Sequence, residues 1–576
     1  MMNDYDLIIR NGTVIDGSGG AEITADVAVR DGKIAAIDGS ISGKGIEEID
    51  ATGKLETPGF VDVHTHYDGQ VTWSGDLRQS SCHGVTTVVV GNCGVGFAPC
   101  RQTDHDALVN VMEGVEDIPE VVMAEGLPWN WETFPDYLDA LDARQWDIDV
   151  AAYLPHSPLR VYVMGQRGLD REPATAEDMA RMAALTQEAM AAGALGFSTS
   201  RTLVHRRGDG EFIPSFHADT EELVTIAKAV GEYQYGVVQM IPNLDTEDYE
   251  LDVKLLKDLA HASGGVVTYS LAQWLADSTG WRKTLDRMDQ YNREEGTHLV
   301  AQVFPRPMGV IGGLETSANP FSLCPSYAPL AELPLAEKVR ALRDPELKQR
   351  LLGETPADPT NPLYKMMRNF DDIYRMDEIP DYEPAEDKSI SGLARARGIS
   401  AIEMAYELLL EDEGRALLFV PFANYVDKNL DATLEMIRDD NSVIGLGDGG
   451  AHYGLISDSS YTTTLLTHWT RDRSGPKVDL PWAIKALSAD TADLVGLTDR
   501  GRLAVGKKAD INIIDHGALR LHRPRILFDL PGGGRRMVQD AEGFVATVVN
   551  GEIISRDGQP TGAKPGRLVR RGRLSA

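Results

Sequence analysis

Two histidines one residue apart are the first candidates for chemistry in this 576-residue sequence. His64 and His66 follow the run FVDV, which has the apolar character of a buried strand. Alternate side chains of a strand point to the same face, so the two imidazoles would converge at a spacing suited to one metal ion. The pair therefore predicts a metal site at a strand end. The alternative is two polar histidines in a loop.

An aspartate closes the last strand-like run of the middle region. Asp448 lies in VIGLGDGGAH. If the strands close into a barrel, the last strand neighbours the first, and this carboxylate reaches a metal on His64 and His66 and the water beside it. It would then serve as ligand, general base or both. The alternative is an aspartate in a glycine-rich turn.

A cysteine follows the second strand-like run. Cys93 lies in VVVGNCGVG. Next to the two histidines, its thiolate would be a good zinc ligand. A small buried core residue is the alternative, because free cysteine packs as a hydrophobic side chain.

The elements that must position these residues alternate between short apolar runs and helical patterns, which is typical of βα units. We expect an α/β fold, a (β/α)₈ TIM-like barrel over residues 58–502. The eight strand candidates are Phe60–His64, Thr86–Val90, Asp149–Leu154, Ala194–Ser198, Gly236–Met240, Gly265–Ser270, His298–Val303 and Ser442–Gly447.

Residues 304–441 are too long for one crossover helix, and we interpret them as an insertion over the face where barrel active sites lie. The run ALLFVPF at 416–422 is itself strand-like, so the seventh strand could be assigned there instead. Both chain ends, 1–57 and 503–576, are strand-rich with Asn-Gly and Asp-Gly turns. We expect them to form one small β-sandwich domain; two independent end domains are the alternative.

Composition excludes several classes of function. The net charge is −32, which disfavours nucleic acid and anionic membranes as partners. Four cysteines do not suggest a disulfide framework. We see no secretory leader and no apolar run of about 18 residues, so we expect a cytoplasmic protein.

Several segments resemble the metal-dependent amidohydrolase superfamily. They are GFVDVHTHYD, GVTTVVVGNCG, VIGLGDGGAH, DRGRLAVGKKADINIID and VVNGEIISRDGQPTGAKPGR. Within it, GNCG and the TGAKPGR ending are similar to N-acyl-D-amino-acid deacylases, also called D-aminoacylases. The resemblance covers nearly the whole chain except residues 304–441.

This resemblance implies a zinc-containing barrel in which hydroxide on the metal attacks an amide carbonyl. It implies His64, His66 and Cys93 as ligands. It also implies Asp448 as the aspartate that activates water and then protonates the leaving amine. One or two zinc ions would be bound.

The sequence departs from the family pattern where two further histidine ligands are usual. Gln239 stands at the fifth-strand position, and the sixth strand carries Ser270 but no histidine. The fourth strand, in GALGFSTSR, offers no lysine to bridge two metals. Either one metal is held by His64, His66 and Asp448, with or without Cys93, or loops supply histidines. The loop candidates are His156, His205, His217 and His452.

Candidates for substrate contacts are Arg306, Arg201, Gln239 and Ser270. The two arginines are candidates because a guanidinium can hold a carboxylate through two hydrogen bonds. Arg206 and Arg207 follow the same strand as Arg201. The aromatic residues of LPWNWETF, which include Trp129, Trp131 and Phe134, would form an apolar wall or pack within their own loop.

We therefore predict a metal-dependent hydrolase of a linear amide, most like an N-acyl-D-amino-acid deacylase, acting on a small molecule. One alternative is a cyclic amidohydrolase of the hydantoinase type. Another is an amidohydrolase-like protein that binds a ligand without catalysis. A homo-oligomer stays open, with the insertion as lid or interface.

Overall fold

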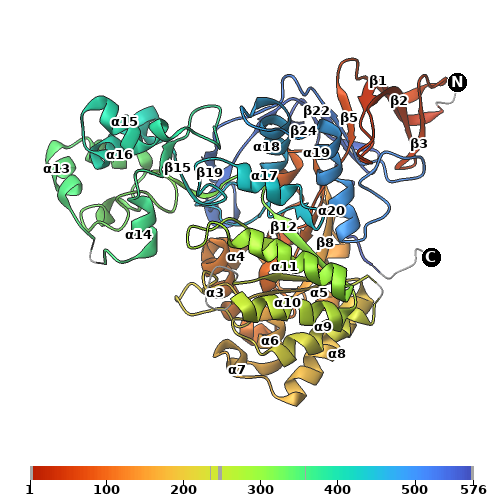
Figure 1. Cartoon of the computed structure of the whole chain (residues 1–576), viewed down its shortest axis with the longest axis horizontal. Coiled ribbons are helices and arrows are strands. Elements are labelled where there is room, and N and C mark those ends of the chain that lie inside the picture. Colours follow the sequence, from red (N-terminus) through yellow and green to blue (C-terminus); the bar gives the residue numbers. More distant parts are fainter. Residues whose placement is uncertain (1–3, 234, 244–248, 357, 572–576) are drawn as a thin grey trace.

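The computed structural model describes residues 4–233, 235–243, 249–356 and 358–571 (Figure 1). Its centre is an eight-stranded sheet in which all hydrogen-bonded neighbours run parallel, in the order β16-β12-β11-β10-β9-β8-β7-β6. The strands are β6 (Phe60–Asp62), β7 (Val85–Val90), β8 (Asp149–Pro155), β9 (Gly196–Ser200), β10 (Val237–Ile241), β11 (Val266–Leu271), β12 (His298–Val303) and β16 (Ser442–Ile444).

A strand lies at each of the eight predicted places; most boundaries shift by one or two residues, and two of the shifts affect the site. Strand β6 ends at Asp62 and β16 ends at Ile444, so His64 and Asp448 lie in the loops that follow. The amide of His64 donates to the Asp62 carboxylate at 3.1 Å instead of to a neighbouring strand. Leu446 and Asp448 have φ angles of 64° and 45°, which extended backbone does not allow.

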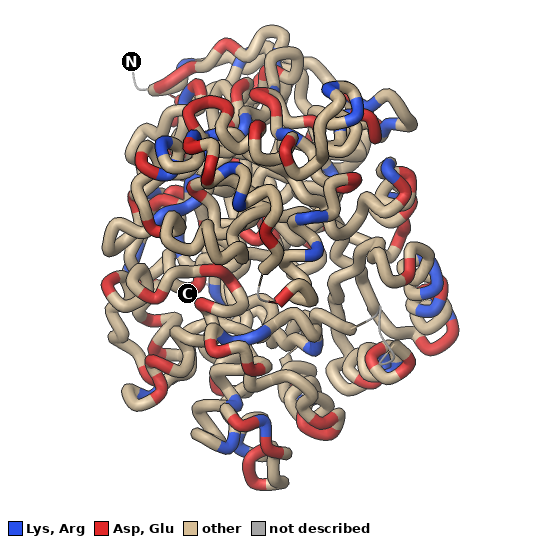
Figure 2. Tube along the Cα trace, turned by 90° about the vertical axis from the view of Figure 1, so that its left-hand side faces the viewer, with Lys and Arg blue, Asp and Glu red and all other residues tan. Residues whose placement is uncertain are grey.

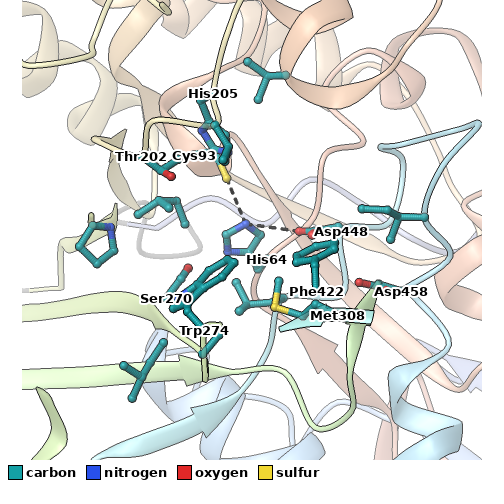
Figure 3. A pocket seen from close by; sticks show the side chains of 18 of the residues that line it. His64, Cys93, Thr202, His205, Ser270, Trp274, Met308, Phe422, Asp448 and Asp458 are labelled. Atoms are coloured by element: carbon teal, nitrogen blue, oxygen red, sulfur yellow. Dashed lines mark hydrogen bonds and ion pairs between the residues drawn. The ribbon is translucent and has the colours of Figure 1, made fainter. Parts of the chain in front are cut away.

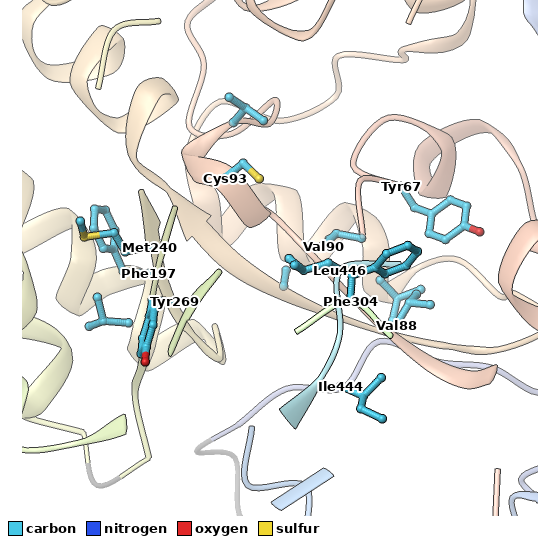
Figure 4. Close-up of a cluster of buried hydrophobic side chains, with 14 of the residues drawn as sticks. Tyr67, Val88, Val90, Cys93, Phe197, Met240, Tyr269, Phe304, Ile444 and Leu446 are labelled. Atoms are coloured by element: carbon cyan, nitrogen blue, oxygen red, sulfur yellow. The ribbon is translucent and has the colours of Figure 1, made fainter. Parts of the chain in front are cut away.

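Helices of the βα units pack against this sheet. Thr175 begins α8 with a capping box: its hydroxyl accepts from the Asp178 amide, and the Asp178 carboxylate accepts from the Thr175 amide. Apolar side chains of strands and helices share one buried cluster, part of which Figure 4 shows. The helices are α3 (His105–Glu116), α4 (Glu120–Gly126), α5 (Phe134–Asp142), α6 (His156–Met164), α8 (Ala176–Ala192), α9 (Thr220–Gly231), α10 (Tyr249–Ser263), α11 (Gly280–Glu295), α17 (Asp431–Ile437), α19 (Leu480–Leu487) and α20 (Ala489–Leu494).

Both ends of the chain meet in a second, nine-stranded sheet, at the upper right of Figure 1. Its order is β24-β23-β22-β17-β5-β1-β2-β3, with β4 paired to β1. The strands are β1 (Tyr5–Val14), β2 (Ile23–Arg30), β3 (Lys33–Asp38), β4 (Gly45–Asp50), β5 (Leu55–Pro58), β17 (Ile511–Ile514), β22 (Phe544–Val549), β23 (Glu552–Arg556) and β24 (Gln559–Pro560). Beyond β24 the chain leaves this sheet, and residues 566–569 hydrogen-bond to Trp146 and Val150 beside β8.

Residues 308–423, which lie between β12 and β16 in the sequence, form a unit of their own toward the left of Figure 1. Its three-stranded antiparallel sheet has the order β13-β15-β14. The run 416–422 belongs to this sheet, so the seventh strand of the central sheet is His298–Val303, as first assigned. The elements are β13 (Met308–Gly312), α12 (Leu335–Leu342), α13 (Pro345–Gly353), α14 (Pro362–Met367), β14 (Tyr374–Arg375), α15 (Ile390–Arg397), α16 (Ala401–Leu409) and β15 (Leu418–Ala423).

Acidic and basic residues are interspersed over the face shown in Figure 2. All four cysteines are free thiols. Within the described ranges, no helix combines the length and the apolar character that a membrane span requires.

Candidate metal centre and active-site cavity

Four donor atoms from three loops converge at one end of the central sheet (Figure 3). His64 Nε2 lies 3.3 Å from Cys93 Sγ, and His66 Nε2 lies 3.5 Å from the same sulfur. Asp448 Oδ1 lies 3.5 Å from His64 Nε2 and 3.7 Å from His66 Nε2. The structure thus brings together all four residues that the sequence predicts as metal ligands.

These distances fit a zinc ion. Zinc bonds of about 2.0–2.3 Å in a tetrahedron place donor atoms about 3.3–3.6 Å apart. Asp448 Oδ1 is buried and has no hydrogen-bond partner in the described structure. An orphaned carboxylate oxygen beside two imidazoles and a thiol is the environment that a bound cation would satisfy.

Burial keeps both imidazoles neutral, which is the form that binds metal. It lowers the pKa of His64 to about 4, against an opposing hydrogen bond with Gln302, and the pKa of His66 well below its usual value. His64 Nδ1 lies 2.9 Å from Gln302 Oε1, an acceptor, so the proton sits on Nδ1. That leaves the lone pair of Nε2 directed toward the cysteine and aspartate.

The loop that carries Cys93 is held in an unusual backbone conformation. Cys93 has φ +56°, in the left-handed region that side chains rarely adopt. Its amide donates to Gln239 Oε1 at 3.2 Å, and the next amide, of Gly94, donates to Ser198 Oγ at 3.0 Å. Strands β9 and β10 therefore fix the position of the thiol, and Gln239 acts here through the backbone of Cys93.

Glu116, at the end of α3, is a site residue that the sequence analysis missed. Its side chain is buried, with Oε1 3.2 Å from His66 Nδ1 and Oε2 3.6 Å from His452 Nε2. A carboxylate behind a metal-binding histidine fixes the ring and its tautomer. A signal was present, because Leu108, Met112 and Glu116 recur at helical spacing on the buried face.

Burial is the main cause that raises the pKa of both carboxyl groups at the centre. The pKa of Asp448 is well above its usual value, and the charges of Asp458 and Asp62 add to this. The pKa of Glu116 is raised in the same way, with Asp448 and Asp68 adding to it. Burial disfavours the charged form of each carboxyl group, and a cation at this site would favour it.

A cavity of about 500 Å³ opens beside the four donors. Its wall is largely apolar, and the rings of Trp274 and Phe422 stack with centroids 6.2 Å apart. Phe422 and Met308 come from β15 and β13, so the insertion builds part of the wall (Figure 3). Further apolar lining residues are Val115, Ile241, Leu271, Trp281, Leu446, Leu455 and Ile456.

The substrate-contact candidates fall in different places. Ser270 lines the cavity, and its hydroxyl has no partner in the described structure. Gln239, Arg201 and Arg306 are not among the lining residues. The guanidinium of Arg201 binds Asp252 at 2.6 Å, and that of Arg306 binds Asp458 at 2.9 Å. A role for these residues at the substrate stays a prediction.

Two of the four loop histidines, His205 and His452, line the cavity. His156 is buried between Thr199 and Glu222 instead, and His217 is exposed beside Phe216. Arg206 and Arg207 also lie outside the lining, as do the aromatic residues Trp129, Trp131 and Phe134. Among the described residues, the three-donor group with metal-binding geometry is His64, His66 and Cys93.

Known proteins resemble this chain over most of its length. The model of the amidohydrolase family matches residues 47–555. An uncharacterised protein of Mycobacterium tuberculosis is 29% identical over 99% of this chain and 97% of its own. D-aminoacylase of Alcaligenes xylosoxydans xylosoxydans is 35% identical over 40% of this chain and 43% of its own.

A solved structure supports the fold. N-acyl-D-glutamate deacylase from Bordetella bronchiseptica, complexed with zinc and a phosphonate inhibitor, superimposes with a TM-score of 0.65. The match covers 98% of this chain and 99% of that one, at 23% identity. The family match spans far more than half of the sequence, and the chain belongs to the amidohydrolase family, as a hydrolase acting on C–N bonds.

Proposed function

We propose that the protein is a zinc-dependent hydrolase of linear amides, with one zinc ion bound by His64, His66, Cys93 and Asp448. The observation that carries this proposal is the convergence of two neutral imidazoles, a thiol and an unpartnered carboxylate oxygen within 3.3–3.7 Å contacts. A mixed nitrogen and sulfur donor set suits zinc. Gln239 and Ser270, at the positions where further histidines were expected, support a single ion.

Zinc, when bound, supplies a Lewis acid that acidifies water and polarises a carbonyl oxygen. The chain itself supplies proton transfer: Asp448 accepts the proton of the attacking water and delivers it to the nitrogen of the departing amine. Gln302 hydrogen-bonds to Nδ1 of His64, and the Glu116 carboxylate lies 3.2 Å from Nδ1 of His66. The apolar wall excludes water from the bound amide.

The proposed architecture is a closed (β/α)₈ barrel over residues 58–502 with a β-sandwich domain from 1–57 and 503–576. Hydrogen bonds between the loops after β6 and β16 support closure: the Asp448 amide donates to the His64 carbonyl, and the His66 amide donates to the Gly449 carbonyl. The nine-stranded sheet from both chain ends supports the second domain.

A linear amide is favoured over a ring amide. The relatives named above include a D-aminoacylase, and β9 carries Ser198, Thr199 and Ser200 but no lysine to join two metals. Retention of all four donors also favours catalysis over ligand binding without turnover.

The test is zinc content together with amide hydrolysis. Purified protein and His64→Ala are analysed for metal, with His217→Ala as the matched control, since that histidine is exposed and lies outside the cavity lining. We expect one zinc per chain in the wild type and the control, and loss in His64→Ala. A chelator should stop hydrolysis of a panel of acyl amides, and zinc should restore it. Hydrolysis that persists without any metal would overturn the proposal.

A further inference from the structure

The cavity beside the metal centre carries several acidic side chains and, among the described residues, no lysine or arginine in its lining. The acidic lining residues are Glu116, Asp117, Asp277, Asp448 and Asp458.

Three basic residues outside the lining, Arg306, Arg201 and Lys283, contact other groups of the protein. The Arg306 guanidinium is 1% exposed, pairs with Asp458 at 2.9 Å and stacks over Tyr382, so it neutralises one acid of the wall. Arg201 is held by Asp252 and by the carbonyl of Ala218. Lys283 lies over the Tyr249 ring, and 56% of its side chain faces solvent. Arg201 would have to leave its partners to meet a ligand in the cavity, whereas Nε and Nη1 of Arg306 are buried without a hydrogen-bond partner in the described structure.

This charge pattern disfavours an anionic substrate. An N-acyl amino acid carries its carboxylate on the carbon bonded to the scissile nitrogen, so hydrolysis would place that charge inside the cavity, whose described lining holds no lysine or arginine. A desolvated carboxylate costs several kcal/mol unless a cation or several donors pair with it. Like charges placed together across a binding surface add a further penalty.

The rest of the wall favours an apolar substrate. The stacked rings of Trp274 and Phe422 lie beside Met308, with Trp281 also in the lining. Aromatic side chains of this kind bind flat apolar groups by burial and offset stacking. The cavity volume of about 500 Å³ is within the range for a small organic ligand.

We propose that the substrate is an uncharged amide, without a free carboxylate, whose aromatic or aliphatic group packs against Trp274, Phe422 and Met308. This proposal rests on the amide hydrolysis proposed above. In the reaction, water adds its oxygen to the carbonyl carbon, the C–N bond breaks, and the nitrogen gains a proton. The products are a carboxylic acid and an amine that carries no carboxylate.

The experiment compares matched amides on the zinc-loaded protein. N-acetylphenethylamine is the substrate expected to react, and the D and L forms of N-acetylphenylalanine differ from it only by the carboxylate. Each kcat/KM is divided by the rate of alkaline hydrolysis of the same amide, so intrinsic reactivity cancels. We expect the neutral amide to be preferred by about 100-fold or more, as a penalty of several kcal/mol implies.

A charge reversal at the rim provides a second readout. Asp277→Lys puts a cation in the lining, and we expect it to narrow the preference for the neutral amide about tenfold. The control is Asp286→Lys, which makes the same charge change at an exposed position of α11 that is not in the lining. We expect no change in preference there.

The outcomes separate the two proposals. If N-acetyl-D-phenylalanine is hydrolysed as fast as the neutral amide, the substrate inference fails and zinc-dependent amide hydrolysis stands. If neither these amides nor a wider acyl amide panel is hydrolysed by zinc-loaded protein, both fail. If Asp277→Lys and Asp286→Lys reduced the preference for the neutral amide equally, the inference would also fail. The charge inside the cavity would then not determine which amide is preferred.

Discussion

The Oε1 atom of Glu116 lies 3.2 Å from Nδ1 of His66, and both side chains are buried. The second oxygen of Glu116 faces His452 at 3.6 Å. Glu116 therefore links a proposed ligand to a histidine of the cavity wall. Because a carboxylate at this position orients a metal-binding imidazole, its effect should appear in metal affinity.

Glu116→Gln should weaken zinc binding by about 10–100-fold, because an amide would replace the charged group that lies 3.2 Å from Nδ1 of His66. Competition with a chromophoric chelator measures this. Glu113→Gln, on the same helix, is the control and should bind zinc like the wild type. Unchanged zinc affinity in Glu116→Gln would show that this carboxylate does not support His66.

Asp448→Asn should lower kcat by about 10²–10⁴-fold, because an amide cannot carry the proton from water to the leaving nitrogen. His64, His66 and Cys93 still supply three donors, so zinc content should stay near one per chain. Asp440→Asn, a surface change just before β16, is the control. Hydrolysis at the wild-type rate in Asp448→Asn would remove this residue from the mechanism.

Gln239→Leu should affect zinc affinity, whereas Ser270→Ala should affect KM. Gln239 accepts from the Cys93 amide and lies outside the cavity lining, so its loss leaves a buried donor unpaired, at a cost of about 1–3 kcal/mol. We expect weaker zinc binding with KM unchanged. Ser270→Ala should change KM and leave zinc affinity intact. The reverse result would make Gln239 a substrate contact.

Glu56, in β5, should make stability depend on pH. Burial, with a further contribution from Asp26, raises its pKa from 4.5 to about 8, and neither carboxylate oxygen has a hydrogen-bond partner in the described structure. The folded state therefore binds the proton more tightly than the unfolded state. Its contribution to stability is complete below pH 4.5 and is lost as pH rises to about 8.

Glu56→Gln removes this titration. Thermal unfolding between pH 4.5 and 8 should show the wild type losing stability relative to the variant as pH rises. Parallel curves would show that burial does not perturb this carboxyl group.

The central sheet was predictable because its strands are short, apolar and rich in β-branched residues, as strands buried on both faces must be. The positions of His64 and Asp448 were predictable only in part. Strand alternation suggested that His64 and His66 share a face, whereas the structure places both in the loop after β6. Their convergence depends on hydrogen bonds between loops that no local pattern records.

Other features of the site depend on contacts between distant segments. Phe422 stacks on Trp274 next to a β-bridge that pairs Trp274, in the loop after β11, with Ala423 of the insertion. Nothing in the sequence indicates that these segments are neighbours. The predicted role of Arg201 illustrates the same limit. A guanidinium can bind the carboxylate of a substrate as well as it binds that of Asp252. Only the fold shows which carboxylate lies within reach of Arg201.

The separation between the cavity wall and the four proposed ligands has a consequence for how this protein can change. Met308 and Phe422 belong to the segment between β12 and β16, and none of His64, His66, Cys93 and Asp448 does. That segment has its own hydrophobic cluster, so its stability does not depend wholly on the sheet it covers. Exchanging or shortening it would alter which amides are accepted while the donor set stays in place, which makes it a self-contained unit for evolving or engineering selectivity.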